Sequence, residues 1–250
     1  MERRNDGTME RLIDGMRIAR LSWALVLLSI IPSFQLAAQV GHDPANSPFH
    51  DIQLRPGPVF FVGTLTNDRG RTGAGVSSAL TIGSRYEIPA GRSLLVVFSG
   101  ALLKGDRFII DPAADSSSPS RRTGPFDSNI LLTEIGMQLR LTGAKSWRRI
   151  SPYVGLGLGL AFDLDSPGDT TGSGYKFGTK LTLSGATGVR WYPSRRLMIN
   201  ADVRGQAWRL RYPLSFQSPA SDGSRVVGLT EPTTDWTLHP WISLGVGWTF

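Results

Sequence analysis

Charged and amide side chains occupy one face of several otherwise apolar segments. A spacing of two places each set on one side of an extended strand, where carboxylates and guanidinium groups of facing strands can form buried ion pairs. We expect Glu134 to pair with Arg204, with Asp202 as a second acceptor, because an unpaired buried charge is costly. Such a network fits a structural plug, which we favour, or a gate across a narrow solute path. Its predicted members are Glu134, Gln138, Arg140, Arg190, Asp202 and Arg204.

Other groups give little support to catalysis or metal binding. The chain has no cysteine, which excludes thiolate zinc sites, cysteine nucleophiles and disulfide scaffolds. His239 and Ser243 share one face of the last predicted strand, but a hydrogen-bonded or rim histidine explains this better than a catalytic pair. The dipeptides His42-Asp43 and His50-Asp51 lie in a proline-rich stretch, which disfavours the regular structure needed to aim metal ligands. We therefore predict no catalytic, metal or cofactor site, and no enzyme.

The composition narrows the class of protein. The 250 residues carry a formal net charge of +7, but the basic residues are scattered, so we expect no nucleic-acid partner. Mean hydropathy is −0.08, and only one apolar run resembles a membrane helix, so a helical-bundle transporter is excluded. The 29 glycines indicate closely packed β-structure.

The N-terminal region is typical of an export signal. The apolar run 21–31 follows Arg17 and Arg20, and small residues up to Ala38 suit signal peptidase. A helix of these 11 residues would span about 16 Å, too short for a bilayer core of about 30 Å. The predicted divisions are a signal peptide over 1–38, a periplasmic N-terminal linker over 39–57 and a folded body over 58–250.

Eight segments of the body alternate between apolar and small or polar residues, which is the periodicity of β-strands. In the last segment, every even-numbered residue from Trp236 to Phe250 is apolar. Both faces of 58–66 and 92–104 are apolar, so the direction of their faces stays unassigned. The predicted strands are 58–66, 76–86, 92–104, 131–141, 153–163, 181–192, 197–208 and 235–250.

The connections between these segments alternate in length. The connections 89–91, 143–150 and 193–196 are short. This alternation predicts an up-and-down arrangement with tight turns at one end, long loops at the other, and both ends of the body on the side of the turns. At the other end, the connection 67–72 is of modest length, and the long connections are 105–127, 165–176 and 213–234.

Three features favour a transmembrane barrel over a soluble sandwich or a lipocalin-like barrel. The faces opposite the apolar ones combine glycines with the charged residues named above, as a narrow lumen would. The apolar faces carry no charge until Arg209 and Arg211, which we expect above the lipid. Aromatic residues gather near the strand ends, as at two membrane interfaces. They are Tyr86, Trp147, Tyr153, Trp191 and Trp248 near the turns, and Phe162, Tyr175, Trp208, Tyr212 and Trp236 near the loops.

The closing segment 241–250 resembles the C-terminal strand of bacterial outer-membrane β-barrels, with alternating apolar residues and a terminal phenylalanine. In that family the barrel assembly machinery reads this segment, so the resemblance implies an assembly signal at Trp248 and Phe250. With its signal peptide and eight strands, the chain is similar to the small barrels that include OmpA, OmpX and OmpW. This implies an all-β, eight-stranded antiparallel up-and-down transmembrane β-barrel, monomeric and in contact with outer-membrane lipid and lipopolysaccharide.

An eight-stranded barrel has an interior just wide enough for side chains, so an open general porin is disfavoured. We therefore expect an integral protein of the bacterial outer membrane with a structural, surface-interaction or minor permeability role. The alternative is a narrow small-solute channel of the OmpW type. A lipid A-modifying barrel enzyme is the second alternative.

Overall fold

A computed structural model describes residues 47–66, 68–165, 169 and 171–248. The chain divides into a unit over 1–47 and a unit over 48–250, and the fold described below is that of the second unit. The predicted signal peptide lies outside the described residues. No helix among the described residues combines the length and the hydropathy needed to cross a bilayer.

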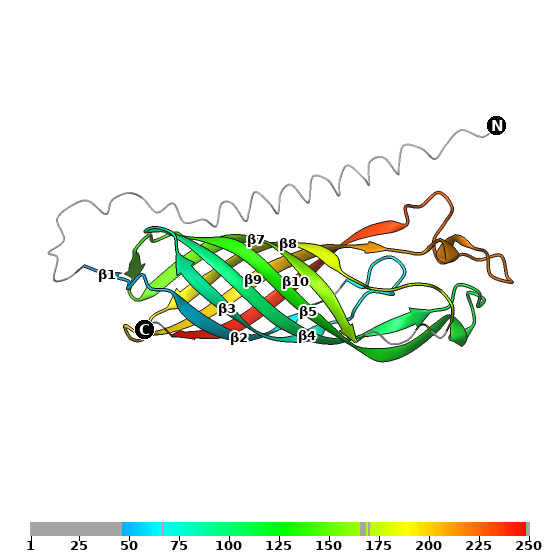
Figure 1. The fold of residues 1–250 in the computed structure, drawn as a ribbon, viewed down its shortest axis with the longest axis horizontal. Helices are drawn as coiled ribbons and strands as arrows, with labels where there is room; N and C mark the ends of the chain where they lie inside the picture. The colour runs from blue at the N-terminus through cyan, green and yellow to red at the C-terminus, as the bar shows by residue number, and fades with distance from the viewer. Residues whose placement is uncertain (1–46, 67, 166–168, 170, 249–250) are drawn as a thin grey trace, which may run out of the picture. The chain divides into compact units, whose positions relative to one another are not determined.

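Eight long strands form a closed antiparallel barrel (Figure 1). Each long strand pairs with the next one along the chain, and β10 pairs with β2 to close the sheet. The predicted eight-stranded up-and-down barrel is confirmed. The long strands are β2 (Gly57–Leu65), β3 (Ala79–Pro89), β4 (Leu94–Ile110), β5 (Arg122–Arg140), β7 (Ile150–Asp165), β8 (Lys180–Trp191), β9 (Leu197–Arg211) and β10 (Thr234–Trp248).

The barrel is apolar on its outside and mixed on its inside. Along β10, the even-numbered residues from Trp236 to Trp248 are exposed, whereas the odd-numbered residues from Thr237 to Gly247 are buried. The same alternation holds on β8 and β9, because successive side chains of a strand point to opposite faces. An apolar outer belt of this kind suits lipid as the surrounding solvent.

The structure shows which face of β2 and of β4 points into the lumen, where the sequence had shown two apolar faces for each strand. On β2, Phe61 and Leu65 point into the lumen while Phe60 points outward. On β4, Leu103 is buried inside and Phe98 is exposed outside. The lumen wall is therefore apolar along these two strands and polar along much of β5, β8 and β9.

The turns and loops fall at opposite ends of the barrel, here called the short-turn end and the loop end (Figure 1). The loop predicted over 105–127 is shorter in the structure, because β4 continues to Ile110 and β5 starts at Arg122. Paired backbone groups thus extend beyond the apolar belt, and the true connection is 111–121. Two short 3₁₀ helices lie in the loops, η3 (Pro119–Arg121) and η4 (Leu214–Gln217).

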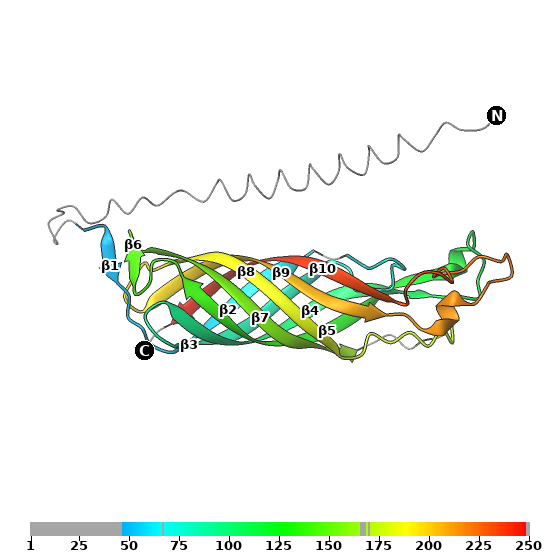
Figure 2. The same cartoon turned by 90° about the horizontal axis from the view of Figure 1, so that it is seen from above.

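Two strands of three residues each form a small additional ladder at the short-turn end. β1 (Phe49–Asp51) pairs with β6 (Lys145–Trp147), and the two lie together in Figure 2. The Ile52 N–H also donates to the carbonyl of Ala144 at 2.9 Å. We expected irregular structure across 39–57, but residues 49–51 form the regular strand β1, which corrects that expectation. Its three residues lie between Pro48 and Pro56, so no proline interrupts the ladder.

Four of the ten aromatic residues expected at the membrane interfaces are instead buried. Tyr153 and Trp208 point into the lumen because they have the opposite strand parity to the exposed residues. Tyr175 and Tyr212 lie beyond the strands and fold inward. Val76, the first residue of the predicted strand 76–86, is also buried, since it precedes β3 and packs inside.

The apolar core fills the lumen at the loop end. Trp208 and Leu210 of β9 pack there with Phe216 and Val227 from the last loop. The ring of Phe216 stacks on Tyr175 at 6.0 Å and on Tyr212 at 6.1 Å between centroids. The long loops therefore close over the barrel instead of leaving its mouth open.

Candidate functional site

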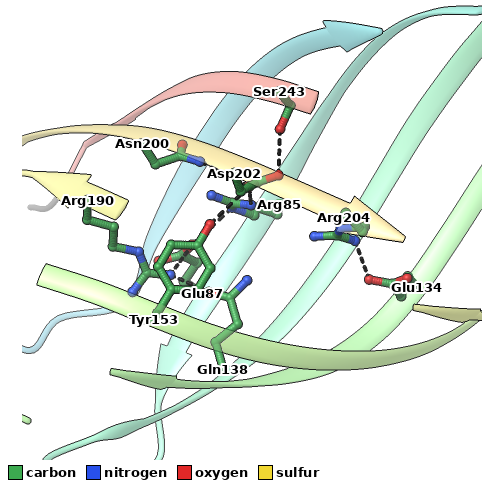
Figure 3. A network of polar contacts seen from close by, with 10 residues as sticks. All are labelled: Arg85, Glu87, Glu134, Gln138, Tyr153, Arg190, Asn200, Asp202, Arg204 and Ser243. Atoms are coloured by element: carbon green, nitrogen blue, oxygen red, sulfur yellow. Dashed lines mark hydrogen bonds and ion pairs between the residues drawn. The ribbon is translucent and has the colours of Figure 1, made fainter. Parts of the chain in front are cut away.

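A charged network fills the lumen toward the short-turn end (Figure 3). Arg85 of β3 lies at its centre, with Nε 3.0 Å from Glu87 Oε1 and Nη1 2.8 Å from Asp202 Oδ2. Arg190 Nη2 lies 2.9 Å from the same Glu87 oxygen. All four side chains are at most 9% exposed. Two guanidinium groups and two carboxylates thus balance in a space where an unpaired charge would be costly.

Asp202 of β9 receives hydrogen bonds from several strands. The Tyr153 hydroxyl on β7 donates to Oδ2 at 3.0 Å, and Asn200 Nδ2 donates to the same oxygen at 3.2 Å. The Ser243 hydroxyl on β10 donates to Oδ1 at 2.8 Å. Together with Arg85 these groups give both carboxylate oxygens hydrogen-bond partners, as a buried charge requires. They also connect β3, β7, β9 and β10 across the lumen.

Arg190 extends the network to β5. Its Nη2 donates to Gln138 Oε1, and its guanidinium lies 4.5 Å above the centroid of the Tyr153 ring. The guanidinium group therefore contacts Glu87, Gln138 and Tyr153. Figure 3 shows Arg190, Gln138 and Tyr153 converging from three strands.

A separate ion pair lies nearer the middle of the lumen. Arg204 Nη1 contacts Glu134 Oε1, and the two side chains are 7% and 6% exposed. The Arg204 guanidinium also lies 5.2 Å from the centroid of the Trp241 ring. We expected Asp202 to be a second acceptor for Arg204, and this expectation is corrected. The hydrogen bonds that Asp202 accepts come from Arg85 and three neutral groups.

Glycines make the space that these side chains occupy. A Cβ placed on Gly157 of β7 would lie 2.5 Å from Glu134 Cδ and 2.6 Å from Ser184 Oγ. A Cβ on Gly188 of β8 would lie 2.7 Å from the Tyr153 hydroxyl. The inward glycines that the sequence places opposite the apolar faces are therefore the counterparts of large polar residues on neighbouring strands.

Arg140 stands apart from these ion pairs. Its Nη2 donates to the carbonyl of Arg92 at 3.0 Å, in the turn before β4. Sequence reasoning also missed two members of the network, Arg85 and Glu87, as site residues. Their spacing of two on the inward face of one strand was a usable signal, because opposite charges at that spacing can share partners.

The cavities of the lumen are small. One near the short-turn end, lined in part by Glu87, Arg140 and Arg190, has a volume of about 30 Å³. A second, beside Glu134 and Arg204, has a volume of about 10 Å³. Each is smaller than a drug-sized ligand site, which needs about 300 Å³ or more.

The residues weighed for catalysis have other partners. His239 is buried, with Nε2 2.8 Å from the Thr237 hydroxyl and its ring stacked on Trp208 at 3.8 Å. Ser243 donates its hydroxyl to Asp202. Among the described residues there is also no group of three or more histidine, cysteine, aspartate or glutamate side chains suited to a metal ion.

The predicted assembly signal is described only in part. Trp248 ends β10, is 47% exposed on the outer face and pairs with Leu197 of β9. Phe250 lies outside the described residues.

Comparison with solved structures identifies the architecture. The outer-membrane protein OprG from Pseudomonas aeruginosa matches with a TM-score of 0.52 and 14% identity, over 82% of this chain and 99% of that one. This chain has the fold of an eight-stranded outer-membrane β-barrel. Neisserial surface protein A also matches, with a TM-score of 0.44, 13% identity and coverage of 82% and 98%. Ail of Yersinia pestis matches with a TM-score of 0.34, 12% identity and coverage of 78% and 98%.

Comparison at the level of sequence adds nothing to this. No protein-family model matches the chain, and no curated protein sequence matches it. The role of the barrel therefore has to be argued from the lumen and the loops themselves.

Proposed function

We propose that the protein is an integral outer-membrane barrel with a structural or surface-interaction role, whose lumen is closed to solutes. The observation that supports this most is the network of Arg85, Glu87, Arg190 and Asp202, which joins side chains across the lumen. Moving a solute past it would break several charge-assisted hydrogen bonds between buried side chains, at high cost.

The loop end supports the surface-interaction part of the proposal. Asp222 Oδ2 accepts from the Ser116 N–H and hydroxyl, both at 2.8 Å, and Arg121 Nη1 donates to the Ser224 hydroxyl at 2.8 Å. These contacts tie loop 111–121 to the last loop. A pre-ordered loop surface loses less entropy when it binds a partner.

We place the protein among non-catalytic barrels. A nucleophilic serine needs a base within hydrogen-bond reach, and that base must be free to accept a proton. Ser243 is instead hydrogen-bonded to Asp202, and His239 to Thr237. Along β10, Trp241 lies between Ser243 and His239. The lipid A-modifying alternative has no geometry in its favour.

The partners proposed for this role are lipid and lipopolysaccharide outside and the barrel assembly machinery during insertion. The exposed apolar belt supports contact with lipid. Arg209 and Arg211 are exposed directly above the belt, and Trp236 is the cross-strand neighbour of Arg209. Two cations beside an interfacial tryptophan suit phosphorylated headgroups. A monomer, a signal peptide over 1–38 and delivery to the outer membrane complete the proposal, with no nucleic-acid partner.

A narrow small-solute channel remains the second candidate, and one observation favours it. Near the middle of the lumen, Glu134, the partner of Arg204, faces the inward glycines Gly157 and Gly159 of β7. A swing of one side chain would leave small residues along that wall.

Conductance of the purified protein in planar bilayers separates the two candidates. We expect no channel steps from the wild type or from Glu134→Ala. Steps in the wild type that change in Glu134→Ala, but not in the loop variant Glu231→Ala, would establish the channel and reject a closed lumen. Migration of the unboiled protein in membrane fractions tests the membrane assignment, since folded barrels resist detergent. Recovery from the soluble periplasm without a heat-dependent shift would reject that assignment.

A further inference from the structure

Residues 52–56, here called the strap, cross the mouth of the barrel at the short-turn end. They join β1 to β2, and β1 lies beside β6 at the start of β7 (Figure 2). Around the closed sheet, β2 lies four strands from β7 in either direction, so the strap must pass from one side of the mouth to the other. In agreement with this path, Leu54 of the strap lines one small cavity together with Leu95 of β4 and Arg190 of β8.

A much larger cavity lies beside the strap. Its volume is about 620 Å³, within the range of about 300–1,000 Å³ that is typical of ligand sites. Three segments that are far apart in the sequence line it. They are residues 50–53, the turn before β7 with Ser146 and Arg149, and the connection of β8 to β9 with Leu197 and Met198. The cavity therefore has the size of a binding site, at the end of the barrel where outer-membrane proteins have their periplasmic turns.

Arginine side chains make this cavity positively charged. Arg149 Nη1 donates to the Pro193 carbonyl at 3.0 Å, which holds the guanidinium group between two turns. A guanidinium group has five N–H donors, and this bond uses one of them. Arg195 lines the same cavity from the β8–β9 connection. Asp51 lines it as well, but Lys145 lies opposite Asp51 in the β1–β6 ladder, so the cations outnumber the carboxylate.

The surroundings of the cavity are also basic. The segments between the long strands at this end are 48–56, 90–93, 141–149 and 192–196. They carry seven arginine or lysine residues and one acidic residue, Asp51. A surface of one sign attracts ligands of the opposite sign before they make contact. The basic residues are Arg55, Arg92, Lys145, Arg148, Arg149, Arg195 and Arg196.

β1 also presents backbone groups for strand pairing. It is the last strand in the sheet order, so among the described residues only its β6 edge is paired with a strand. On that edge the Pro48 carbonyl accepts from the Arg148 N–H at 2.7 Å, and the Ile52 N–H donates to a carbonyl of the β5–β6 turn. Backbone groups alternate between the two edges of a strand, so the N–H and carbonyl of Asp51 point away from β6. An extended peptide can add to such an edge.

These features together favour one class of ligand. Guanidinium groups bind carboxylates through charge-assisted hydrogen bonds, and a strand edge binds an extended main chain. A metal cation would be repelled by Arg149 and Arg195, and a small inorganic anion would leave the edge of β1 unused. Leu197 and Met198 add apolar contact for a peptide side chain.

We propose that the cavity beside the strap binds an extended acidic peptide segment of a periplasmic protein. The segment pairs with β1 and places a carboxylate at Arg149 and Arg195. This site is separate from the proposed closure of the lumen, because a peptide bound at the mouth neither requires nor prevents conduction. A conducting wild type would reject the closed lumen and leave the peptide site to be judged by the tests below.

Titration of the full-length mature barrel in phosphatidylcholine nanodiscs with end-blocked pentaglutamate measures this binding. We expect one saturable site, no binding of end-blocked pentaglutamine, and a dissociation constant about tenfold higher in Arg149→Gly. Glycine suits the left-handed backbone of Arg149, whose φ is 69°, so the variant keeps the fold. Absence of saturable pentaglutamate binding would overturn the proposal.

Arg148→Gly is the matched control. Arg148 is also left-handed, with φ of 47°, but its guanidinium lies 5.2 Å from the centroid of the Trp147 ring and does not line the cavity. Its removal should change the dissociation constant by less than about twofold, since only the general attraction of the surface is reduced. Equal losses in Arg148→Gly and Arg149→Gly would show diffuse attraction instead of a site.

Strand pairing has a test of its own. Asp51→Pro removes the N–H that points away from β6, whereas Asp51→Ala keeps it. We expect Asp51→Pro to bind pentaglutamate about fivefold more weakly than Asp51→Ala. Equal binding by the two variants would reject the pairing with β1.

Mass spectrometry of the lipid that co-purifies with the barrel tests the other anionic occupant of such a site. We expect equal amounts of phosphatidylglycerol in the wild type, Arg148→Gly and Arg149→Gly. Phosphatidylglycerol lost only in Arg149→Gly, together with absent pentaglutamate binding, would assign the cavity to a lipid headgroup and overturn the peptide proposal.

Discussion

The Glu134 carboxylate occupies the volume that a side chain on Gly157 would fill. A Cβ at Gly157 would lie 2.5 Å from Glu134 Cδ, closer than two carbon atoms can approach. The ion pair between Glu134 of β5 and Arg204 of β9 therefore depends on a third strand, β7. Gly157 of that strand has no side chain and so leaves space for the Glu134 carboxylate. Glycine in a strand interior normally weakens the strand. The packing of Glu134 explains why position 157 is nevertheless a glycine.

Gly157→Ala should displace Glu134 and lengthen its contact with Arg204. We expect a loss of roughly 1–3 kcal/mol in unfolding free energy, as for other overpacked interiors. The loss is measured from urea titrations of the heat-modifiable folded band. Gly185→Ala is the control, because a Cβ there meets only Leu156 Cδ2, at 3.9 Å. Equal stability of the two variants would contradict the packing argument.

The Glu134–Arg204 pair should behave as a buried pair in a double-mutant cycle. Glu134→Gln leaves the Arg204 charge unpaired and should cost roughly 3–5 kcal/mol. Adding Arg204→Met should restore much of this, because both charges are then gone. The exposed pair of Arg71 and Glu231, at 40% and 47% exposure, is the comparison, and Glu231→Gln should cost about 1 kcal/mol or less. A double variant as unstable as Glu134→Gln alone would show that the two charges do not compensate each other.

The periodicity of the sequence was sufficient to predict the barrel and the inward parity of most strands, since a period of two is a direct consequence of strand geometry. It was insufficient for β2 and β4, where both faces are apolar. There the choice between Phe60 and Phe61 depends on the close approach of Phe61 to Gly83, where a Cβ would lie 2.6 Å from the Phe61 ring. Such a contact between strands has no local signal.

The members of the charged network were predictable, but not their partners. Glu134 and Arg204 do contact each other, as expected from their depth along the strands. The partner of Asp202 depends on the stagger between β3 and β9, which are not neighbours in the sheet. Burial of Tyr175 was also unpredictable, because it depends on loops that fold back over the lumen.

The β1–β6 ladder should be trapped by a disulfide. The chain has no cysteine, and Asp51 lies opposite Lys145 in the antiparallel register. Cα atoms so placed are about 4.5–5.5 Å apart, within the range of a disulfide. Asp51→Cys with Lys145→Cys should therefore cross-link on mild oxidation, seen as a reducible mobility change of the denatured protein. The control pairs Asp51→Cys with Lys176→Cys at the loop end, and equal yields would contradict the ladder.

Arg209 and Arg211 should bind phosphorylated headgroups at the outer edge of the belt. Replacing both by glutamine should lower the lipopolysaccharide that co-purifies with the barrel and make its binding less dependent on salt. Mass spectrometry of extracted lipid gives the amount per barrel. Arg195→Gln with Arg196→Gln removes two charges from the opposite end and should have no effect. Equal lipopolysaccharide in both double variants would exclude the headgroup site.

Asp222 should hold the two loops together well into the acidic range. Hydrogen bonds from Ser224 and from the N–H and hydroxyl of Ser116 hold the pKa of its carboxyl well below the ordinary value of about 3.9. A depressed pKa means that the tie is present above the ordinary value and is lost only as pH falls through the lower, folded one. The loops should therefore still be joined at pH 3.

Pepsin at pH 3 measures this directly. We expect slow cleavage of loop 111–121 in the wild type and cleavage several-fold faster in Asp222→Asn, which cannot carry the charge that its donors stabilise. Asp127→Asn, at an exposed position of β5, is the matched control and should leave the rate unchanged. Equally fast cleavage of the wild type and Asp222→Asn at pH 3, with protection of the wild type restored near pH 5, would place the pKa of Asp222 at its ordinary value.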